Sequence, residues 1–250
     1  MTGGILFPAL LLTLAATAGA QTFDVAVIKP SAPGARGGMI RQMPGGQRYS
    51  GANIPLKLIM TVAYSVTDRQ ISGGPDWVAT EPFDIEAKSE SRHTSEELHD
   101  MLARLIEARF QLKIRRETKQ LPVYELVIDK SGSKLGEHEP RDLDYPPMGP
   151  APDGLKGTNV TMQYFALVLS RNLDRTVVDK TGLPARYDLT LHYSREGAGG
   201  PVRLNGAETP DSDAPTSFTA LREQLGLRLV PAKGPVEFLV IEHAEKPADN

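Results

Sequence analysis

The chain has 250 residues, with 28 basic and 31 acidic side chains, no cysteine and 40% hydrophobic residues. A chain of this size and composition can bury one large core or two smaller ones, which excludes a disordered polymer and a disulfide-stapled miniprotein. The formal net charge of -3 gives no general attraction for nucleic-acid phosphates or anionic lipid, so we expect neither as a partner.

Residues 1–20 are predicted to be a secretory signal peptide. They carry no charged side chain, residues 5–16 form an apolar run, and Ala18-Gly19-Ala20 has the small residues typical of a cleavage site. The run is too short for a membrane-spanning helix, which needs about 20 apolar residues. An uncleaved anchor is the alternative. We expect a periplasmic or secreted protein that begins at Gln21 and folds without disulfides.

Residues 21–129 are predicted to form a first α+β module. Alternating apolar residues predict an N-terminal strand over 23–28, and Pro44-Gly45-Gly46 marks a hairpin over 39–49. Apolar residues at i, i+3, i+4 and i+7 predict one amphipathic helix from Leu56. A second begins at Thr94, whose spacing to Glu97 is that of a capping box. Further strands are predicted over 83–87, 112–116 and 123–128.

Residues 130–157 are rich in Pro, Gly and charged side chains, a composition that predicts a linker without core elements. Residues 158–250 are predicted to form a second α+β module, with a helix from Met162 and Thr161 as its N-cap. The remaining predicted elements are a helix over 218–225, strands over 187–191, 227–230 and 236–241, and an inserted loop over 195–215.

The two modules are predicted to be copies of one unit. Four pairs of segments keep their order along the chain: Asn53-Ile54-Pro55-Leu56 with Asn159-Val160-Thr161-Met162, Phe83-Asp84-Ile85 with Tyr187-Asp188-Leu189, residues 110–113 with 225–228, and residues 122–128 with 235–241. The expected fold class is therefore α+β, with two repeated small modules, each having two amphipathic helices packed on short strands.

Five motifs resemble those of a secreted family of unknown function that is expanded in soil acidobacteria and sometimes fused to antibiotic-sensor-type membrane metallopeptidases. They are Phe23-Asp24-Val25-Ala26-Val27-Ile28-Lys29-Pro30, Gly73-Gly74-Pro75-Asp76-Trp77, Phe83-Asp84-Ile85-Glu86-Ala87-Lys88, Val178-Asp179-Lys180-Thr181-Gly182-Leu183 and Ile241-Glu242-His243-Ala244-Glu245-Lys246-Pro247. The resemblance implies no catalytic residues. In element order, each half also resembles the short N-terminal domain of secretins and TonB-dependent receptors, which implies protein contacts.

Three short motifs follow the order used by penicillin-binding proteins: Ser131-x-x-Lys134, Ser170-x-Asn172 and Lys180-Thr181-Gly182. In that chemistry the serine begins a buried helix, where the lysine takes its proton. Ser131 instead begins the Gly-rich segment, and too few residues separate Ser170 from Lys180 for a helical subdomain. We therefore expect turns and a helix end at these motifs, and a serine acyl-enzyme is the alternative.

Histidines and acidic residues give no spacing typical of a metal site. We expect His99 to lie exposed on its helix, and His138 to form a solvated charge cluster with its glutamate neighbours. Glu96 and Glu97 belong to a first helical turn, where negative charge offsets the helix dipole. The other histidines, His93, His192 and His243, show no paired spacing either.

Asp84 and Asp188 occupy matching positions of the two predicted copies, which favours a structural role, such as accepting backbone N–H groups, over catalysis. Trp77 follows a Gly-Gly-Pro turn and is predicted to anchor it in the core. The basic run between Arg104 and Lys119 is interrupted by glutamates, and this favours a solvated face or a contact for an acidic partner.

The sequence thus predicts an exported, cofactor-free protein that binds another envelope or secreted protein or acts as a signalling accessory. Because no set of reactive side chains gathers in it, we expect no catalytic, cofactor-binding or metal-binding residues. A cell-wall or β-lactam-related serine acyl-enzyme or sensor is the alternative function.

Overall fold

The computed structural model describes residues 21–35, 38–138, 148–151, 153–193 and 215–247. The predicted signal peptide and nearly all of the predicted loop over 195–215 lie outside them. The described residues form five α-helices and three sheets, which confirms the α+β class. None of the described helices has the length and apolar character needed to cross a membrane.

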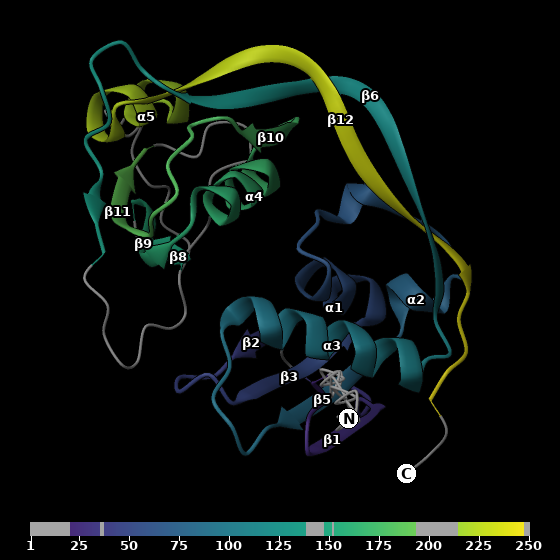
Figure 1. The fold of residues 1–250 in the computed structure, drawn as a ribbon. Helices are drawn as coiled ribbons and strands as arrows, with labels where there is room; N and C mark the ends of the chain where they lie inside the picture. Colours follow the sequence, from purple (N-terminus) through teal and green to yellow (C-terminus); the bar gives the residue numbers. More distant parts are fainter. Residues whose placement is uncertain (1–20, 36–37, 139–147, 152, 194–214, 248–250) are drawn as a thin grey trace, which may run out of the picture.

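The first lobe, residues 21–112, is built on an antiparallel sheet (Figure 1). Helices α1 (Leu56–Ala63) and α3 (Ser95–Arg109) bury their apolar stripes against its inner face. The sheet order is β1 (Val25–Pro30), β5 (Pro82–Lys88), β3 (Arg48–Pro55) and β2 (Met39–Gln42), and the lobe also contains η1 (Asp68–Gln70), β4 (Ile71–Gly73) and α2 (Trp77–Thr80).

Trp77 lies at the start of α2, as an aromatic anchor of the first lobe. Its ring packs against Phe83 and Phe110, with centroid distances of 6.1 and 6.0 Å. Phe83 and Phe110 themselves meet edge to face at 5.1 Å. This cluster fixes the Gly-Gly-Pro turn on the core, as the sequence predicts.

The second lobe, residues 129–226, has a sheet with the order β7 (Gly136–Glu137), β11 (Tyr187–His192), β9 (Gly154–Val160) and β8 (Met148–Ala151). Helices α4 (Met162–Asn172) and α5 (Ser217–Leu225) contribute to the same core. Strand β10 (Thr176–Asp179) is not part of this sheet and pairs with a strand of the third sheet.

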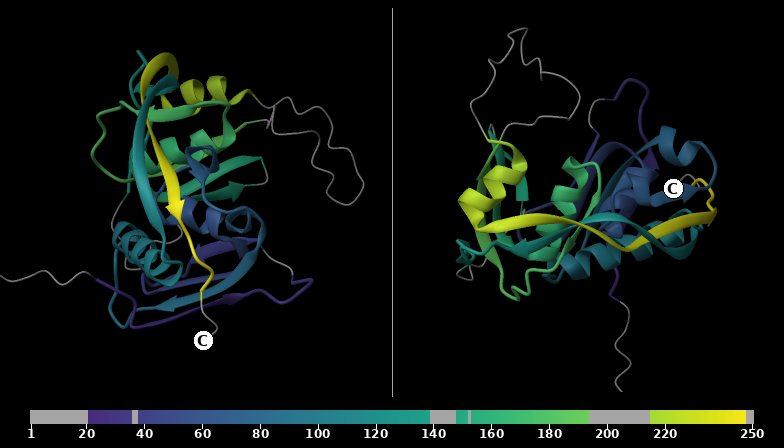
Figure 2. Two further views of the ribbon diagram at one scale, coloured as in Figure 1. Left: turned by 90° about the vertical axis from the view of Figure 1, so that its right-hand side faces the viewer. Right: turned by 90° about the horizontal axis from the view of Figure 1, so that it is seen from above.

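A ribbon of two long antiparallel strands, β6 (Lys113–Ile128) and β12 (Leu227–His243), runs along both lobes (Figures 1 and 2). Strand β10 joins the ribbon in parallel to β6, and β4 joins it in parallel to β12. The sequence prediction of four short strands here is wrong. The prolines do not break the strands because the middle of the ribbon is only two strands wide, so edge positions are available to them.

Each strand of the ribbon begins in one lobe and ends in the core of the other. Strand β6 follows α3, yet its Leu126 belongs to the core of the second lobe. Strand β12 follows α5, yet its Leu239 and Ile241 belong to the core of the first lobe. Both cores are therefore completed by side chains from the far half of the chain.

The segment 130–157 was predicted to be a linker, but three strands, β7, β8 and β9, begin within it. Leu155 of β9 is buried in the second core. A Cβ at Gly154 would overlap the carbonyl oxygen of Leu191 on the neighbouring strand, so glycine permits the close pairing there. At Gly154, a glycine that indicates a loop by composition instead permits a close strand contact.

Candidate functional site

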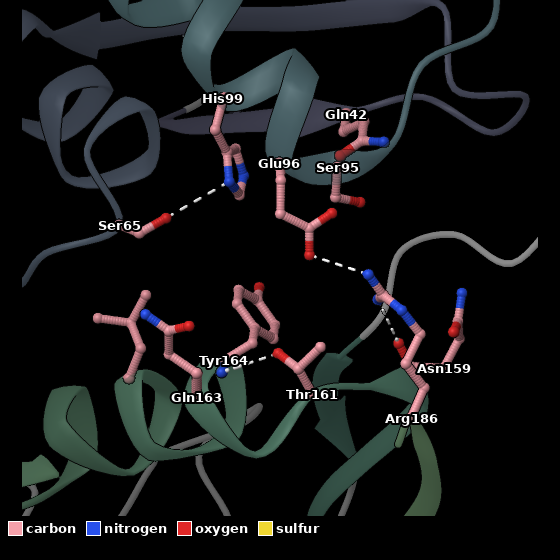
Figure 3. Close-up of a pocket in the computed structure, with 11 residues that line it drawn as sticks. Gln42, Ser65, Ser95, Glu96, His99, Asn159, Thr161, Gln163, Tyr164 and Arg186 are labelled. Atoms are coloured by element: carbon pink, nitrogen blue, oxygen red, sulfur yellow. Dashed lines mark hydrogen bonds and ion pairs between the residues drawn. The ribbon is translucent and has the colours of Figure 1, made fainter. Parts of the chain in front are cut away.

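A pocket with a volume of about 180 Å³ lies between the two lobes (Figure 3). Its walls come from β2, α3 and the turn after α1 on one side and from β9, α4 and the residue before β11 on the other. The lining residues are Gln42, Ser65, Ser95, Glu96, His99, Asn159, Thr161, Gln163, Tyr164, Leu167 and Arg186. Polar groups from both lobes converge in this pocket.

The capping box at Thr94 sets the first-lobe wall. The Thr94 side chain accepts the backbone N–H of Glu97, and the Glu97 carboxylate accepts the N–H of Thr94, as the sequence predicts. This start point places Ser95, Glu96 and His99 on the first turns of α3, facing the second lobe (Figure 3).

Gln42, at the end of β2, is the most unusual polar residue of the pocket. Its side chain is buried at 4% exposure, and its Oε1 atom has no hydrogen-bond partner. Leaving a buried acceptor unpaired costs about 1–3 kcal/mol. The Oε1 atom itself is not accessible to solvent, so a ligand in the pocket would remove that cost only after the Gln42 amide turns toward it.

His99 lies half-buried in the pocket, so the prediction of an exposed side chain is wrong. Its ring stacks on Tyr49 with a centroid distance of 6.3 Å, and its Nδ1 atom is 3.4 Å from the Ser65 hydroxyl. Burial lowers the pKa of His99, Glu96 opposes that shift, and Arg171 adds to it. The imidazole is therefore neutral at pH 7. The spacing of residues within α3 does not indicate that the second lobe lies over His99.

The second-lobe wall is set by the N-cap of α4. The Thr161 hydroxyl accepts the N–H of Tyr164, so Gln163, Tyr164 and Leu167 lie on the face of the first turns that lines the pocket. Burial raises the pKa of Tyr164. The phenol therefore stays neutral and contributes only a hydrogen-bonding group and an aromatic surface.

An ion pair between Glu96 and Arg186 crosses the pocket from one lobe to the other, with Nη2 3.0 Å from Oε1 (Figure 3). The two side chains remain 60% and 40% exposed, so the pair contributes about 0–1 kcal/mol. Burial would raise the pKa of Glu96, but a backbone hydrogen bond and the Arg186 charge outweigh it and lower the pKa. Both groups are therefore charged at neutral pH.

Two further arginines hold the lobes together beside the pocket. Arg69 donates to the carbonyl oxygens of Ser170 (2.7 Å) and Leu173 (3.0 Å) at the C-terminal end of α4. Reciprocally, Arg171 donates to the carbonyl of Thr61 in α1 at 3.2 Å. Cations at helix C-termini satisfy free carbonyls and complement the helix dipole.

The three motifs shared with penicillin-binding proteins do not come together. The Ser131 hydroxyl lies exposed and donates to Asp129, while Lys134 donates to the carbonyl of Glu223. Ser170 is buried at 1% exposure and bridges a turn of α4 to Val177. Lys180 lies exposed after β10. Within the described residues, no hydrogen bond joins one motif to another.

His138 corrects the prediction of a solvated charge cluster. Its side chain is only 2% exposed, and its Nδ1 atom is 2.7 Å from the carboxylate of Asp188. The prediction failed because the segment containing His138 pairs with β11 and brings the ring against that strand. Among the residues that the structure describes, no three His, Cys, Asp or Glu side chains gather as metal ligands would.

Asp84 and Asp188 hold backbone groups in the same way. Asp84 accepts the N–H of Asn53 at 3.0 Å and the hydroxyl of Ser31 at 2.6 Å. Asp188 accepts the N–H of Asn159 at 3.0 Å. Both asparagines have a positive φ, of 57° and 58°, which asparagine tolerates better than most residues. In the second lobe this contact fixes Asn159 at the pocket.

We expect Asp84→Asn to lower the free energy of unfolding at pH 7 by about 1–2 kcal/mol, because a charge-assisted acceptor is lost. The Ser31 hydrogen bond, helped by the Asn53 N–H and opposed by burial, lowers the pKa of Asp84 from 3.8. Its contribution is therefore complete above the unfolded-state pKa and is lost as the pH falls through the lower folded-state pKa. Urea unfolding at pH 7 and pH 3 should show a smaller difference between the two proteins at pH 3. Asp76→Asn, at an exposed position, is the control, and an equal effect of both changes would contradict the prediction.

The basic run forms ion pairs along the ribbon. Arg115 pairs with Glu117 and Glu242, and Arg116 pairs with Glu237. These cations are balanced by neighbouring carboxylates on the same surface. The arrangement is that of a solvated charged face.

A family model described as a protein of unknown function, DUF3738, matches residues 57–244. The chain belongs to the DUF3738 family. The DUF3738 match runs from α1 to the end of β12, so it includes every pocket residue except Gln42. Neither the curated proteins nor the solved structures gave a match.

The pocket contains residues to which the sequence analysis assigned another role or no role. Glu96 was interpreted only as a helix-dipole residue, and Gln42 and Arg186 were not singled out. Their spacing along the chain carries no signal, because the pocket forms only where two lobes meet. Thr161 was predicted to be an N-cap, and the helix that it begins forms one wall of the pocket.

Proposed function

We propose that this protein is an exported, non-catalytic binding protein that holds a small polar ligand in the pocket between its lobes. The observation that carries the proposal is the buried, unpartnered Oε1 atom of Gln42 in a pocket lined from both lobes. A buried polar atom without a partner requires an explanation, and a ligand bound beside it is one.

The geometry favours binding over catalysis. The contact between Ser65 and His99, at 3.4 Å, is longer than the distance of about 2.6–3.2 Å typical of a serine held by its activating base. Glu96 pairs with Arg186 and therefore does not orient the imidazole. A serine, a histidine and a carboxylate share the pocket without forming a relay.

The size of the pocket also argues against a β-lactam ligand. Its volume of about 180 Å³ is below the roughly 300–1,000 Å³ of sites for drug-sized molecules. We infer an accessory role in which the occupied protein acts on another envelope or secreted protein. Neither nucleic acid nor a membrane surface is part of this proposal.

We also propose that the two lobes are copies of one unit that have exchanged the ends of their last strands. Support comes from the corresponding sheet orders, β1-β5-β3-β2 and β7-β11-β9-β8. The paired Asp84–Asn53 and Asp188–Asn159 contacts add to it. Duplication would place the pocket at the junction of the copies, where lobe movement can be coupled to binding.

The binding proposal is tested by thermal unfolding of residues 21–250 with glycine, N-acetylglucosamine, succinate or putrescine added separately. At 100 times its dissociation constant, a ligand stabilises the folded state by about 2.7 kcal/mol. For a chain of this length the melting temperature then rises by about 5–10 °C. We expect at least one of the four compounds to produce such a rise.

Gln42→Met is the matched variant, because it keeps the side-chain length and removes the buried acceptor. Without added compound it should melt no lower than the natural protein, since the unpaired group is gone. With the stabilising compound its melting temperature should stay unchanged. No stabilisation by any of the four compounds, or equal stabilisation of the variant, contradicts the proposed function.

A further inference from the structure

We propose that the ligand is a small zwitterion, a free α-amino acid, held by its ammonium group on the first lobe and its carboxylate on the second. This inference rests on the proposed function and specifies the chemistry of the same pocket. It starts from the two opposite charges, Glu96 and Arg186, that face each other across the pocket from different lobes.

The first-lobe wall is rich in hydrogen-bond acceptors. Figure 3 shows Gln42, Ser95 and Glu96 gathered at one end of this wall. An ammonium group has three N–H donors. It could therefore donate to the Glu96 carboxylate and to the Ser95 hydroxyl, and to the Oε1 of Gln42 once that amide turns toward the pocket. A hydroxyl or a single amide N–H would satisfy fewer of these acceptors.

The second-lobe wall presents the guanidinium of Arg186, whose planar fork binds a carboxylate through two parallel hydrogen bonds. In the structure it donates to Glu96 at 3.0 Å and to the carbonyl of Asn159 at 3.3 Å. Because the exposed pair with Glu96 is weak, a ligand can replace it at little cost. The other nearby cation, Arg171, is engaged with the Thr61 carbonyl.

Charge balance selects a zwitterion over a simple anion or cation. An anion bound to Arg186 would leave Glu96 facing it without a partner, and a cation bound to Glu96 would do the same to Arg186. Burial keeps His99 neutral at pH 7, so the pocket wall has one negative and one positive side chain. An amino acid inserted between them satisfies both and leaves the site neutral.

The pocket size limits the side chain of the ligand. A volume of about 180 Å³ corresponds to roughly six water molecules, which suits a ligand about as large as alanine or valine. Tyr164 and Leu167 supply apolar surface to the pocket. We therefore expect small aliphatic amino acids to bind more tightly than long or charged ones.

Isothermal titration of residues 21–250 with L-alanine, propanoate and L-alaninamide tests the inference. Propanoate lacks the ammonium group, and L-alaninamide lacks the carboxylate. We expect L-alanine to bind at least tenfold more tightly than either. Arg186→Gln should weaken L-alanine at least tenfold and leave L-alaninamide within about twofold, whereas Glu96→Gln should weaken L-alanine and leave propanoate no weaker.

Two outcomes separate this inference from the proposed function. If another compound, such as N-acetylglucosamine, stabilises the natural protein but not Gln42→Met, while L-alanine does not bind, the zwitterion inference is wrong and the binding function stands. Equal affinities for L-alanine, propanoate and L-alaninamide also overturn the inference. If no compound binds at all, both are overturned.

Discussion

Replacing Leu239 with alanine should lower the free energy of unfolding by about 2–5 kcal/mol, the usual cost of emptying a core leucine site. Leu239 is 0% exposed and lies in the core of the first lobe. Its strand, however, starts in the second lobe directly after α5. The loss of stability is expected to be large because β12 contributes buried side chains to the core of the first lobe.

Leu58→Ala is the matched control for Leu239→Ala. Leu58 lies in α1 of the same lobe and is 38% exposed, so its truncation should cost about 0.5–1 kcal/mol. Urea unfolding of the natural protein and the two variants gives the comparison. Equal losses for Leu58→Ala and Leu239→Ala would contradict the exchange of strand ends between the lobes.

Gly226→Ala should also destabilise the protein strongly, by about 2–5 kcal/mol. Gly226 ends α5 with a φ of 65°, a left-handed conformation that costs an alanine about 1–2 kcal/mol. Its added Cβ would also overlap the carbonyl oxygen of Gly132. Relieving that overlap requires backbone movement, which adds about 1–3 kcal/mol.

Gly182→Ala separates these two contributions. Gly182 has a φ of 67°, nearly the same as Gly226, but nothing lies within 4 Å of its added Cβ. Its replacement should therefore cost only the backbone strain, about 1–2 kcal/mol. Thermal unfolding of both variants measures the difference. If Gly182→Ala were as damaging as Gly226→Ala, the packing of α5 against residues 129–134 would not be the cause.

Local signals in the sequence predicted the local structure well. The capping box at Thr94 and the N-cap at Thr161 begin α3 and α4 where expected, because these signals depend on residues three or four positions apart. The hairpin of β2 and β3 was confirmed for the same reason. Its turn residues lie next to the strands that they join.

Pairings between distant segments could not be predicted. The parallel pairing of β4 with β12 joins Ile71 to Leu239, and no short-range pattern encodes such a contact. The prolines of the ribbon suggested breaks between short strands, whereas the pairing is continuous from Ile128 opposite Leu227 to Ile114 opposite Ile241. Tertiary pairing overrides the local preference there.

The pocket was missed for a related reason. Gln42 lies at the end of an edge strand, and Arg186 comes from a turn in the other half of the chain. Neither belongs to a motif, and each acquires its role only when the lobes meet. The likeness to secretin modules and the predicted partner protein remain predictions.

The most direct test of the binding site is a two-dimensional NMR titration of ¹⁵N-labelled residues 21–250 with glycine, N-acetylglucosamine and succinate in turn. At least one compound should shift the amide signals of Gln42 and Glu96 in one lobe and of Thr161 and Arg186 in the other. Val27, exposed on the outer face of β1, should not move. Shifts confined to one lobe, or no shifts with any of the three compounds, would contradict a ligand site between the lobes.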